Sequence, residues 1–139
     1  MNTSRAAYQT YQKTRVQTAK PASLILLLYQ GGIDNLSAAI RASEEGDTEG
    51  MNRGLNKAQE IILELMVSLD SSRDEEFSLN LMRLYEYMHH RLVQANVEKD
   101  VSGAREIKAM LEELLVTWRE AIEGREDERA EDAPVDVQG

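Results

Sequence analysis

The chain has 139 residues, of which 42% are hydrophobic and 29% are charged, and its formal net charge is −9. This length and composition are typical of one soluble globular domain. The acidic charge argues against a nucleic-acid-binding protein, which needs a dense basic face. Because the chain has no cysteine, it has no disulfide, thiolate nucleophile or cysteine metal ligand, and this composition suits the cytoplasm.

Residues 1–20 form a basic segment with four Lys or Arg residues and no acidic residue. The first stretch of this segment is polar, so it lacks the apolar core of a secretory signal. We expect a basic N-terminal arm over residues 1–20. The arm either docks on the acidic body of the chain or frays at the terminus.

The first helix is expected over residues 21–45 and ends at Gly46. Pro21 fits the first turn of a helix, where its missing N–H is harmless. No proline follows before Pro134, which favours long helices. Five consecutive aliphatic residues, Leu24–Leu28, exceed what one core-facing stripe can hold. They fall far short of the roughly 20 apolar residues that cross a bilayer, so no membrane insertion is expected.

Two adjacent glycines, Gly31 and Gly32, lie in the middle of this helix, where alanine would be more favourable. They allow the close approach of a neighbouring helix or of a bound partner. Three further glycines, Gly46, Gly50 and Gly54, recur at every fourth position. Because they lie in polar sequence, we expect a loose first turn of the second helix rather than a tight contact between helices.

Polar residues mark the limits of the second and third helices. Asp47 or Thr48 can cap the second helix, which is expected to reach Leu69. The polar segment 70–76 then connects it to a third helix over residues 75–98.

The fourth helix follows a tight turn over residues 98–103. Asp100 or Ser102 can cap this helix. We expect it to run to about Ile122, with Gly124 as its C-terminal stop.

All four segments have apolar residues at i, i+3 or i+4, and i+7 spacing. Short connections make sequential helices antiparallel. The predicted fold is therefore all-α, an antiparallel four-helix bundle over residues 21–123. Residues 124–139 are charged and poor in large apolar side chains, which predicts an acidic disordered tail.

The chain has more apolar residues than four core stripes require. Such extra faces are covered by a second copy, a bound partner or the N-terminal arm, unless the core stripes are simply wide. Polar residues beside these faces bridge helices or pair with the backbone of a partner. The extra apolar residues are Leu26, Leu27, Ile33, Ile61, Met66, Val67, Met82, Tyr85 and Val93, and the polar residues are Asn56, Gln59, Arg91 and Asn96.

One short motif, Glu86-x-x-His89, has the spacing that di-iron helical bundles use. Such a site needs a second motif of the same kind, and the chain's other histidine is the adjacent His90. No phosphate-binding loop occurs, and no local pattern indicates a Ser-His-Asp triad. We therefore expect no metal, no cofactor and no enzymatic activity.

Five segments together resemble the flagellar secretion chaperone family called FliS, in the order and spacing of that family. The resemblance covers about residues 7–122, and it departs at Gln30, where an acidic residue is usual. The segments are AYQTYQ (7–12), KPASLILLLYQGGIDNL (20–36), KAQEIILELMVSLD (57–70), NLMRLYEYMHHRLVQANVEKD (80–100) and LLVTWREAI (114–122).

The resemblance implies a cytoplasmic chaperone without a cofactor. Such a chaperone binds the disordered C-terminal region of flagellin, prevents its premature polymerisation and delivers it to the flagellar export gate protein. Its N-terminal segment can cover the hydrophobic groove, and Tyr8 and Tyr11 are the expected cap and gate-docking residues. We expect a client-binding groove lined by Leu26, Ile33, Asn56, Gln59, Met66, Met82, Tyr85, Arg91 and Asn96.

A homodimeric helical bundle that binds a different client is the alternative interpretation. In that case the extra apolar faces of two copies meet each other. The expected oligomeric state is a monomer or a weak homodimer.

Overall fold

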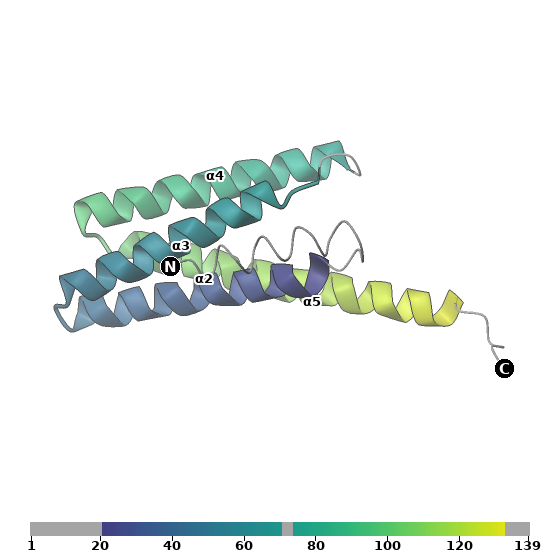
Figure 1. Ribbon diagram of the computed structural model, residues 1–139, viewed down its shortest axis with the longest axis horizontal. Helices are drawn as coiled ribbons and strands as arrows, with labels where there is room; N and C mark the ends of the chain where they lie inside the picture. Colours follow the sequence, from purple (N-terminus) through teal and green to yellow (C-terminus); the bar gives the residue numbers. More distant parts are fainter. Residues whose placement is uncertain (1–20, 71–73, 133–139) are drawn as a thin grey trace.

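A computed structural model describes residues 21–70 and 74–132 of the chain. These residues form helices joined by short connections, and no strand occurs among them. The predicted all-α class is confirmed, whereas the predicted arm over residues 1–20 lies outside the described residues. The helices are α2 (Pro21–Glu44), α3 (Thr48–Val67), α4 (Glu75–Glu98) and α5 (Ser102–Asp132) (Figure 1).

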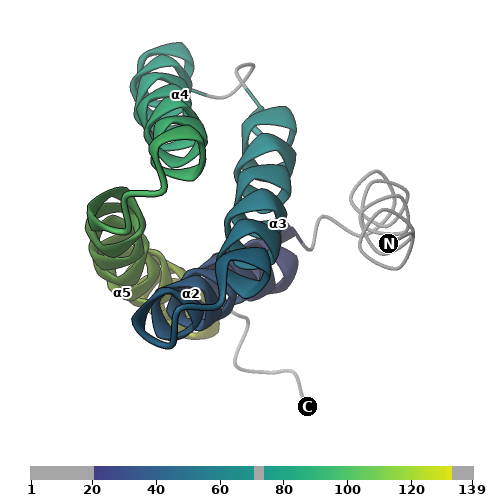
Figure 2. The ribbon, with the colours of Figure 1, turned by 90° about the vertical axis from the view of Figure 1, so that its left-hand side faces the viewer.

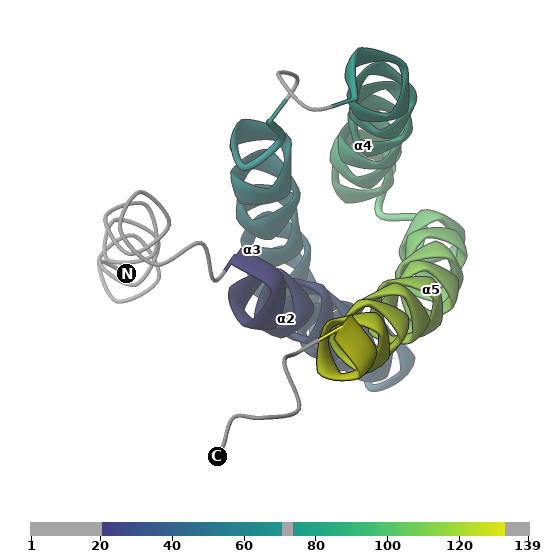
Figure 3. The same cartoon turned by 90° about the vertical axis from the view of Figure 1, so that its right-hand side faces the viewer.

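Sequential helices run antiparallel and surround a common core, so the predicted four-helix bundle is confirmed. Viewed along their axes, the helices follow the order α4, α3, α2, α5 around this core (Figures 2 and 3). Each helix packs against its two neighbours in this ring. The bundle therefore has four lateral seams between neighbouring helices, and each seam has its own chemistry.

One stripe of each helix forms the hydrophobic core. The largest fully buried side chains come from all four helices, and burial of each contributes about 1.5–3 kcal/mol relative to an exposed position. They are Tyr29, Tyr85, Leu36, Leu55, Ile62, Leu65, Met88, Leu92, Ile107 and Leu111.

Helix α2 is the one helix in the described part of the chain that is long and apolar enough to cross a membrane, over Ala22–Glu44, by length and composition alone. Its residues Tyr29, Ile33 and Leu36 are buried in the bundle core. The core position accounts for part of the apolar composition of this helix, whereas Leu27 is 66% exposed.

Aspartate side chains stabilise the starts of three helices, as N-cap acceptors do. The carboxylate of Asp47 accepts a hydrogen bond from the Gly50 amide at 2.9 Å, and Asp74 accepts one from the Phe77 amide at 3.0 Å. At the start of α5, Asp100 accepts from the Ser102 amide at 3.0 Å. Of the expected caps, Asp47 and Asp100 are therefore the ones that the chain uses.

The end predicted for the second helix, at Leu69, is two residues too late, because α3 ends at Val67. Here the Leu69 amide donates to the carbonyl of Met66, and the Ser68 hydroxyl donates to the carbonyl of Leu65. These tighter local bonds close the last turn of α3.

The predicted helix stop at Gly124 is wrong, because α5 continues to Asp132. A Cβ atom added at Gly124 would meet open space, so this glycine makes no close contact that requires it. One helical glycine costs only about 1 kcal/mol relative to alanine, and good helix formers follow it. The division of the chain into arm, bundle and tail stays a prediction, and residues 133–139 lie outside the described residues.

The expectation of a loose turn around Gly50 and Gly54 is also wrong, because both glycines are buried against α2. A Cβ atom at Gly54 would lie 2.6 Å from the carbonyl oxygen of Asn35 and 2.9 Å from the Cβ atom of Ala39. A Cβ atom at Gly50 would lie 2.9 Å from that of Ala42. Small residues on both helices therefore bring the two backbones into close contact.

Gly31 and Gly32 serve the same purpose in the middle of α2. A Cβ atom at Gly31 would lie 3.2 Å from the Cδ1 atom of Ile61 on α3, and one at Gly32 would lie 3.0 Å from the Cδ1 atom of Leu111 on α5. Of the two roles considered for this pair, the structure thus shows the close approach of neighbouring helices. The space that α2 leaves open is filled by side chains of both neighbours.

The two kinds of glycine give a matched test of this packing. We expect Gly54→Ala to lower the free energy of unfolding by about 2 kcal/mol, because the new methyl group overpacks the contact with α2. Gly124→Ala, in open space, should leave it unchanged or raise it by at most about 1 kcal/mol. Urea denaturation followed by circular dichroism measures both, and equal effects of the two substitutions would contradict the close contact.

Candidate binding surface

Exposed apolar side chains gather where α3 faces α4. Leu63 on α3 is 44% exposed, and on α4 Leu79 is 49% and Val93 is 36% exposed. The half-buried residues Gln59, Met66, Met82 and Asn96 lie three or four residues away from them in the chain, and therefore on the same helix faces. We call this surface the α3–α4 seam and define it by Asn56, Gln59, Leu63, Met66, Leu79, Met82, Val93 and Asn96.

A hydrogen bond between side chains joins the two helices at one end of the seam. The amide nitrogen of Asn96 donates to the side-chain oxygen of Asn56 at 3.0 Å. Further along the seam, the buried side-chain nitrogen of Gln59 has no hydrogen-bond partner among the described residues. An unpartnered buried donor is costly.

The structure brings together five of the nine residues expected to line a groove, and it separates the other four. Ile33 is buried on the face of α2 that turns toward α5. Leu26, seven residues earlier, shares that face, and so does Glu44, which pairs with Arg105 of α5 at 3.1 Å. The five residues on the α3–α4 seam are Asn56, Gln59, Met66, Met82 and Asn96.

Arg91 belongs to the seam between α4 and α5. Its Nε atom donates to the carboxylate of Glu106 at 2.9 Å, and the Tyr87 hydroxyl donates to the other oxygen of that carboxylate. The hydrogen bonds from Tyr87 and Arg91 hold the pKa of Glu106 below its usual value. In this conformation Arg91 thus joins α4 to α5 and is turned away from the α3–α4 seam.

Tyr85 lies in the bundle core, so its assignment to a face outside the core is wrong, as it is for Ile33. The Tyr85 hydroxyl lies 2.5 Å from that of Tyr29, and the indole N–H of Trp118 donates to the Tyr29 hydroxyl at 2.8 Å. The ring of Phe77 packs edge-on against Trp118, with 6.4 Å between centroids. This aromatic cluster ties α2, α4 and α5 together.

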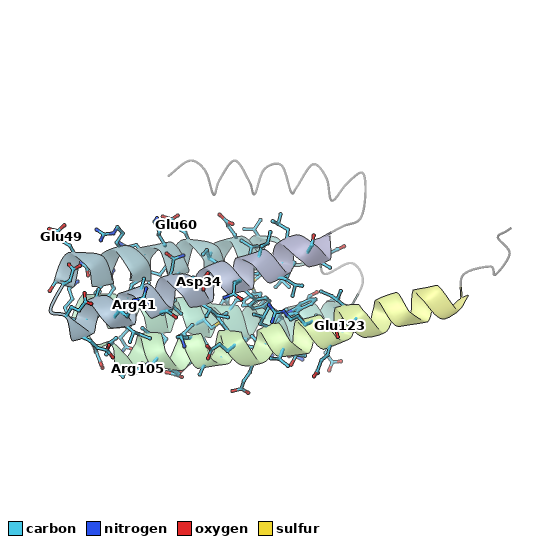
Figure 4. All side chains as sticks on the ribbon, turned by 90° about the horizontal axis from the view of Figure 1, so that it is seen from below. Asp34, Arg41, Glu49, Glu60, Arg105 and Glu123 are labelled. Carbon is cyan, nitrogen blue, oxygen red and sulfur yellow. The ribbon has the colours of Figure 1, made fainter. Side chains whose placement is uncertain are left out.

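Elsewhere on the surface, exposed apolar side chains such as Leu27 of α2 and Val116 of α5 occur on helices that also carry exposed charged residues. Charged residues on α2, α3 and α5 are exposed, and Figure 4 labels six of them, Asp34, Arg41, Glu49, Glu60, Arg105 and Glu123. No group of three or more His, Asp or Glu side chains in the described segments is placed to hold a metal ion. The α3–α4 seam is therefore the best candidate for a binding surface.

Sequence reasoning missed Leu63 and Leu79 as parts of this surface. Leu63 lies four residues after Gln59, and Leu79 lies three residues before Met82, so each shares a helix face with an expected groove residue. Extending the helical spacing from those expected residues would have identified both leucines.

Comparison with known proteins connects this bundle to one family. The chain matches the family model described as flagellar protein FliS over residues 4–125. It is 37% identical to the flagellar secretion chaperone FliS of Bacillus subtilis over 122 residues. The aligned region covers 88% of this chain and 90% of that protein. It is 40% identical over 116 residues to the flagellar secretion chaperone FliSB of Pseudomonas aeruginosa, covering 81% and 92%. The FliS protein of Escherichia coli is 35% identical over 114 residues, covering 79% and 82%.

The aromatic cluster predicts how stability depends on alkaline pH. Burial raises the pKa of both Tyr29 and Tyr85, so the folded state keeps these hydroxyls neutral when the unfolded state ionises them. The stabilisation is complete below the ordinary tyrosine pKa of about 10. It is lost as pH rises above that value, by up to about 1.4 kcal/mol per pH unit for each tyrosine.

We expect Tyr85→Phe to reduce this loss, because one of the two buried hydroxyls is then absent. Urea denaturation of both proteins at a series of alkaline pH values measures the slope. An identical slope for the variant and the parent would contradict the role given to burial.

Proposed function

Since the chain belongs to the FliS family of flagellar secretion chaperones, we propose that it binds the C-terminal region of flagellin in the cytoplasm. The bound chaperone prevents premature polymerisation and delivers the subunit to the flagellar export gate. The relatives are named as flagellar secretion chaperones, which supports an export chaperone role. This family is a chaperone family, and the proposed role includes no catalytic step.

The α3–α4 seam is the observation that carries this proposal. It combines exposed Leu63, Leu79 and Val93 with half-buried methionines, which adapt to irregular apolar partners. From Leu79 to Asn96 the face of α4 extends about 25 Å, at about 1.5 Å per residue. That length accepts nearly five turns of an amphipathic helix laid along the two helices, at about 5.4 Å per turn.

A disordered client must be ordered when it binds, at a cost of about 2–5 kcal/mol. The seam offsets this cost by burying apolar side chains of both partners, at about 25 cal/mol per Å² of apolar surface. The amides of Asn56 and Asn96 add polar groups that fix the client's register. Covering the client's apolar face keeps it from meeting another flagellin subunit.

The remaining expected site residues have different places in this proposal. Ile33 and Tyr85 are buried and act through the core, and Leu26 and Arg91 lie on other seams. Tyr8 and Tyr11 lie outside the described residues, and their docking to the export gate stays a prediction.

The alternative, a homodimer with a different client, uses the same observation. Two copies of one apolar seam can meet in a symmetric interface. The proposed chaperone is instead a monomer or a weak homodimer. Light scattering over a range of concentrations separates the two, since an obligate dimer keeps its doubled mass on dilution.

Charge placed on the seam should abolish client binding. We expect Leu63→Asp and Val93→Asp each to weaken binding of a C-terminal flagellin segment from the same organism at least tenfold, because a buried unpaired carboxylate is strongly unfavourable. Calorimetric titration measures the affinity, and the parent protein should show a large negative heat-capacity change.

Val116→Asp is the matched control for these variants. Val116 is an exposed valine on α5, so its substitution should leave the affinity unchanged. All three variants are first checked for helical content. Equal binding by the seam variants and the control, or no binding by the folded parent, would refute the proposed client site.

A further inference from the structure

The α3–α4 seam ends in a cluster of amide side chains and one lysine. A shallow depression is lined there by Asn52 and Asn56 of α3, by Asn96 and Val97 of α4, and by Lys99 directly after α4. The apolar part of the seam, with Leu63 and Val93, leads to this depression. We call Asn52, Asn56, Asn96 and Lys99 the amide cluster.

Every side-chain oxygen in the amide cluster already accepts a hydrogen bond. The Lys99 ammonium donates to the oxygen of Asn52 and to that of Asn96 at 3.2 Å. The amide nitrogen of Asn96 donates to the oxygen of Asn56 at 3.0 Å. Each of these oxygens keeps one lone pair, while one N–H of Lys99, one N–H of Asn96 and the amide N–H groups of Asn52 and Asn56 stay available, so the cluster offers a ligand more donors than acceptors and one positive charge.

The backbone holds Lys99 in a conformation that glycine usually occupies. Its φ of 55° and ψ of 42° are left-handed, and its amide donates to the carbonyl of Ala95 as a helix C-cap. A residue other than glycine is disfavoured there by roughly 1 kcal/mol. Lysine at this position directs a cation from the end of α4 toward α3, which glycine cannot do.

Lys99 lies between two exposed acidic residues, Glu98 and Asp100. Asp100 uses its carboxylate to accept from the Ser102 amide at the start of α5. The exposed side chains of Lys99 and Asn56 leave the depression open to solvent. A carboxylate matches this arrangement, because it accepts several hydrogen bonds and is attracted by the lysine charge.

We propose that the amide cluster binds the free α-carboxylate at the C-terminus of the client. This inference rests on the proposed function, in which the client is the C-terminal region of flagellin. A chain that lies along the seam and ends at the depression places its terminal carboxylate against Lys99, Asn52 and Asn56. The cluster thereby recognises the C-terminal end of the client and fixes the position of the client along the seam.

Two forms of one peptide test this inference. The C-terminal flagellin segment of the same organism is titrated as the free acid and as the C-terminal amide, which lacks the charge. We expect the amide to bind roughly fivefold more weakly to the parent protein, in the range of a partly exposed charge-assisted hydrogen bond. The difference should shrink as salt is added.

Variants assign the effect to the amide cluster. In Lys99→Gln the acid and the amide should bind equally. Lys57→Gln is the matched control, because Lys57 is an exposed lysine of α3 that lines the depression between α2 and α3. This control should keep the fivefold difference.

Each other outcome has a defined meaning. Equal binding of acid and amide by the parent overturns the inference, and the proposed function survives if the seam variants still abolish binding. A difference that persists in Lys99→Gln places the carboxylate elsewhere. An equal weakening of both forms by Lys99→Gln means that the cluster binds a side-chain carboxylate or the peptide backbone. No binding of either form by the folded protein defeats the proposed function itself.

Discussion

The close contact between α2 and α3 determines which surfaces of the bundle stay open. Gly50 and Gly54 bring the backbone of α3 against Ala39 and Ala42 of α2, and this contact fixes the rotation of α3 about its own axis. Once one side of α3 packs against α2, the side of α3 that faces α4 is fixed as well. The exposed apolar residues of α3 therefore lie beside those of α4, and the open seam is a consequence of the closed one.

The two seams that involve α5 are joined along their length by polar and aromatic contacts. Arg91 and Glu106 form an ion pair between α4 and α5, while the Trp118 indole bonds to Tyr29 between α5 and α2. Between α3 and α4, the side-chain hydrogen bonds in the described segments gather at one end, around Asn56 and Asn96. The α3–α4 seam therefore has hydrogen-bonded polar side chains at one end and apolar side chains along the rest of its length. This arrangement suits a surface that orders a flexible partner and holds it in one register.

Helical periodicity predicted the four helices, their antiparallel order and the caps Asp47 and Asp100, because these features depend on local sequence. Periodicity did not predict which neighbouring helix, if any, each face beside the core stripe contacts. The period of one helix gives the angle between its own residues, whereas the neighbour that a face meets depends on the packing of all four helices. Ile33 and Tyr85 were placed outside the core for this reason. The role of Gly54 was missed because the surrounding polar residues occupy the exposed side of α3 and hide a contact that only the small residues make.

Trp118 is the one tryptophan of the chain, and it lies where three helices meet. Its indole nitrogen bonds to Tyr29 of α2, and Phe77 of α4 packs on its ring. The indole is therefore a native fluorophore at the junction, without competing emission from a second tryptophan. A change in the separation of α2, α4 and α5 alters its hydrogen bond and its exposure to solvent, so the wavelength and intensity of its emission report on the opening of the bundle without any added label.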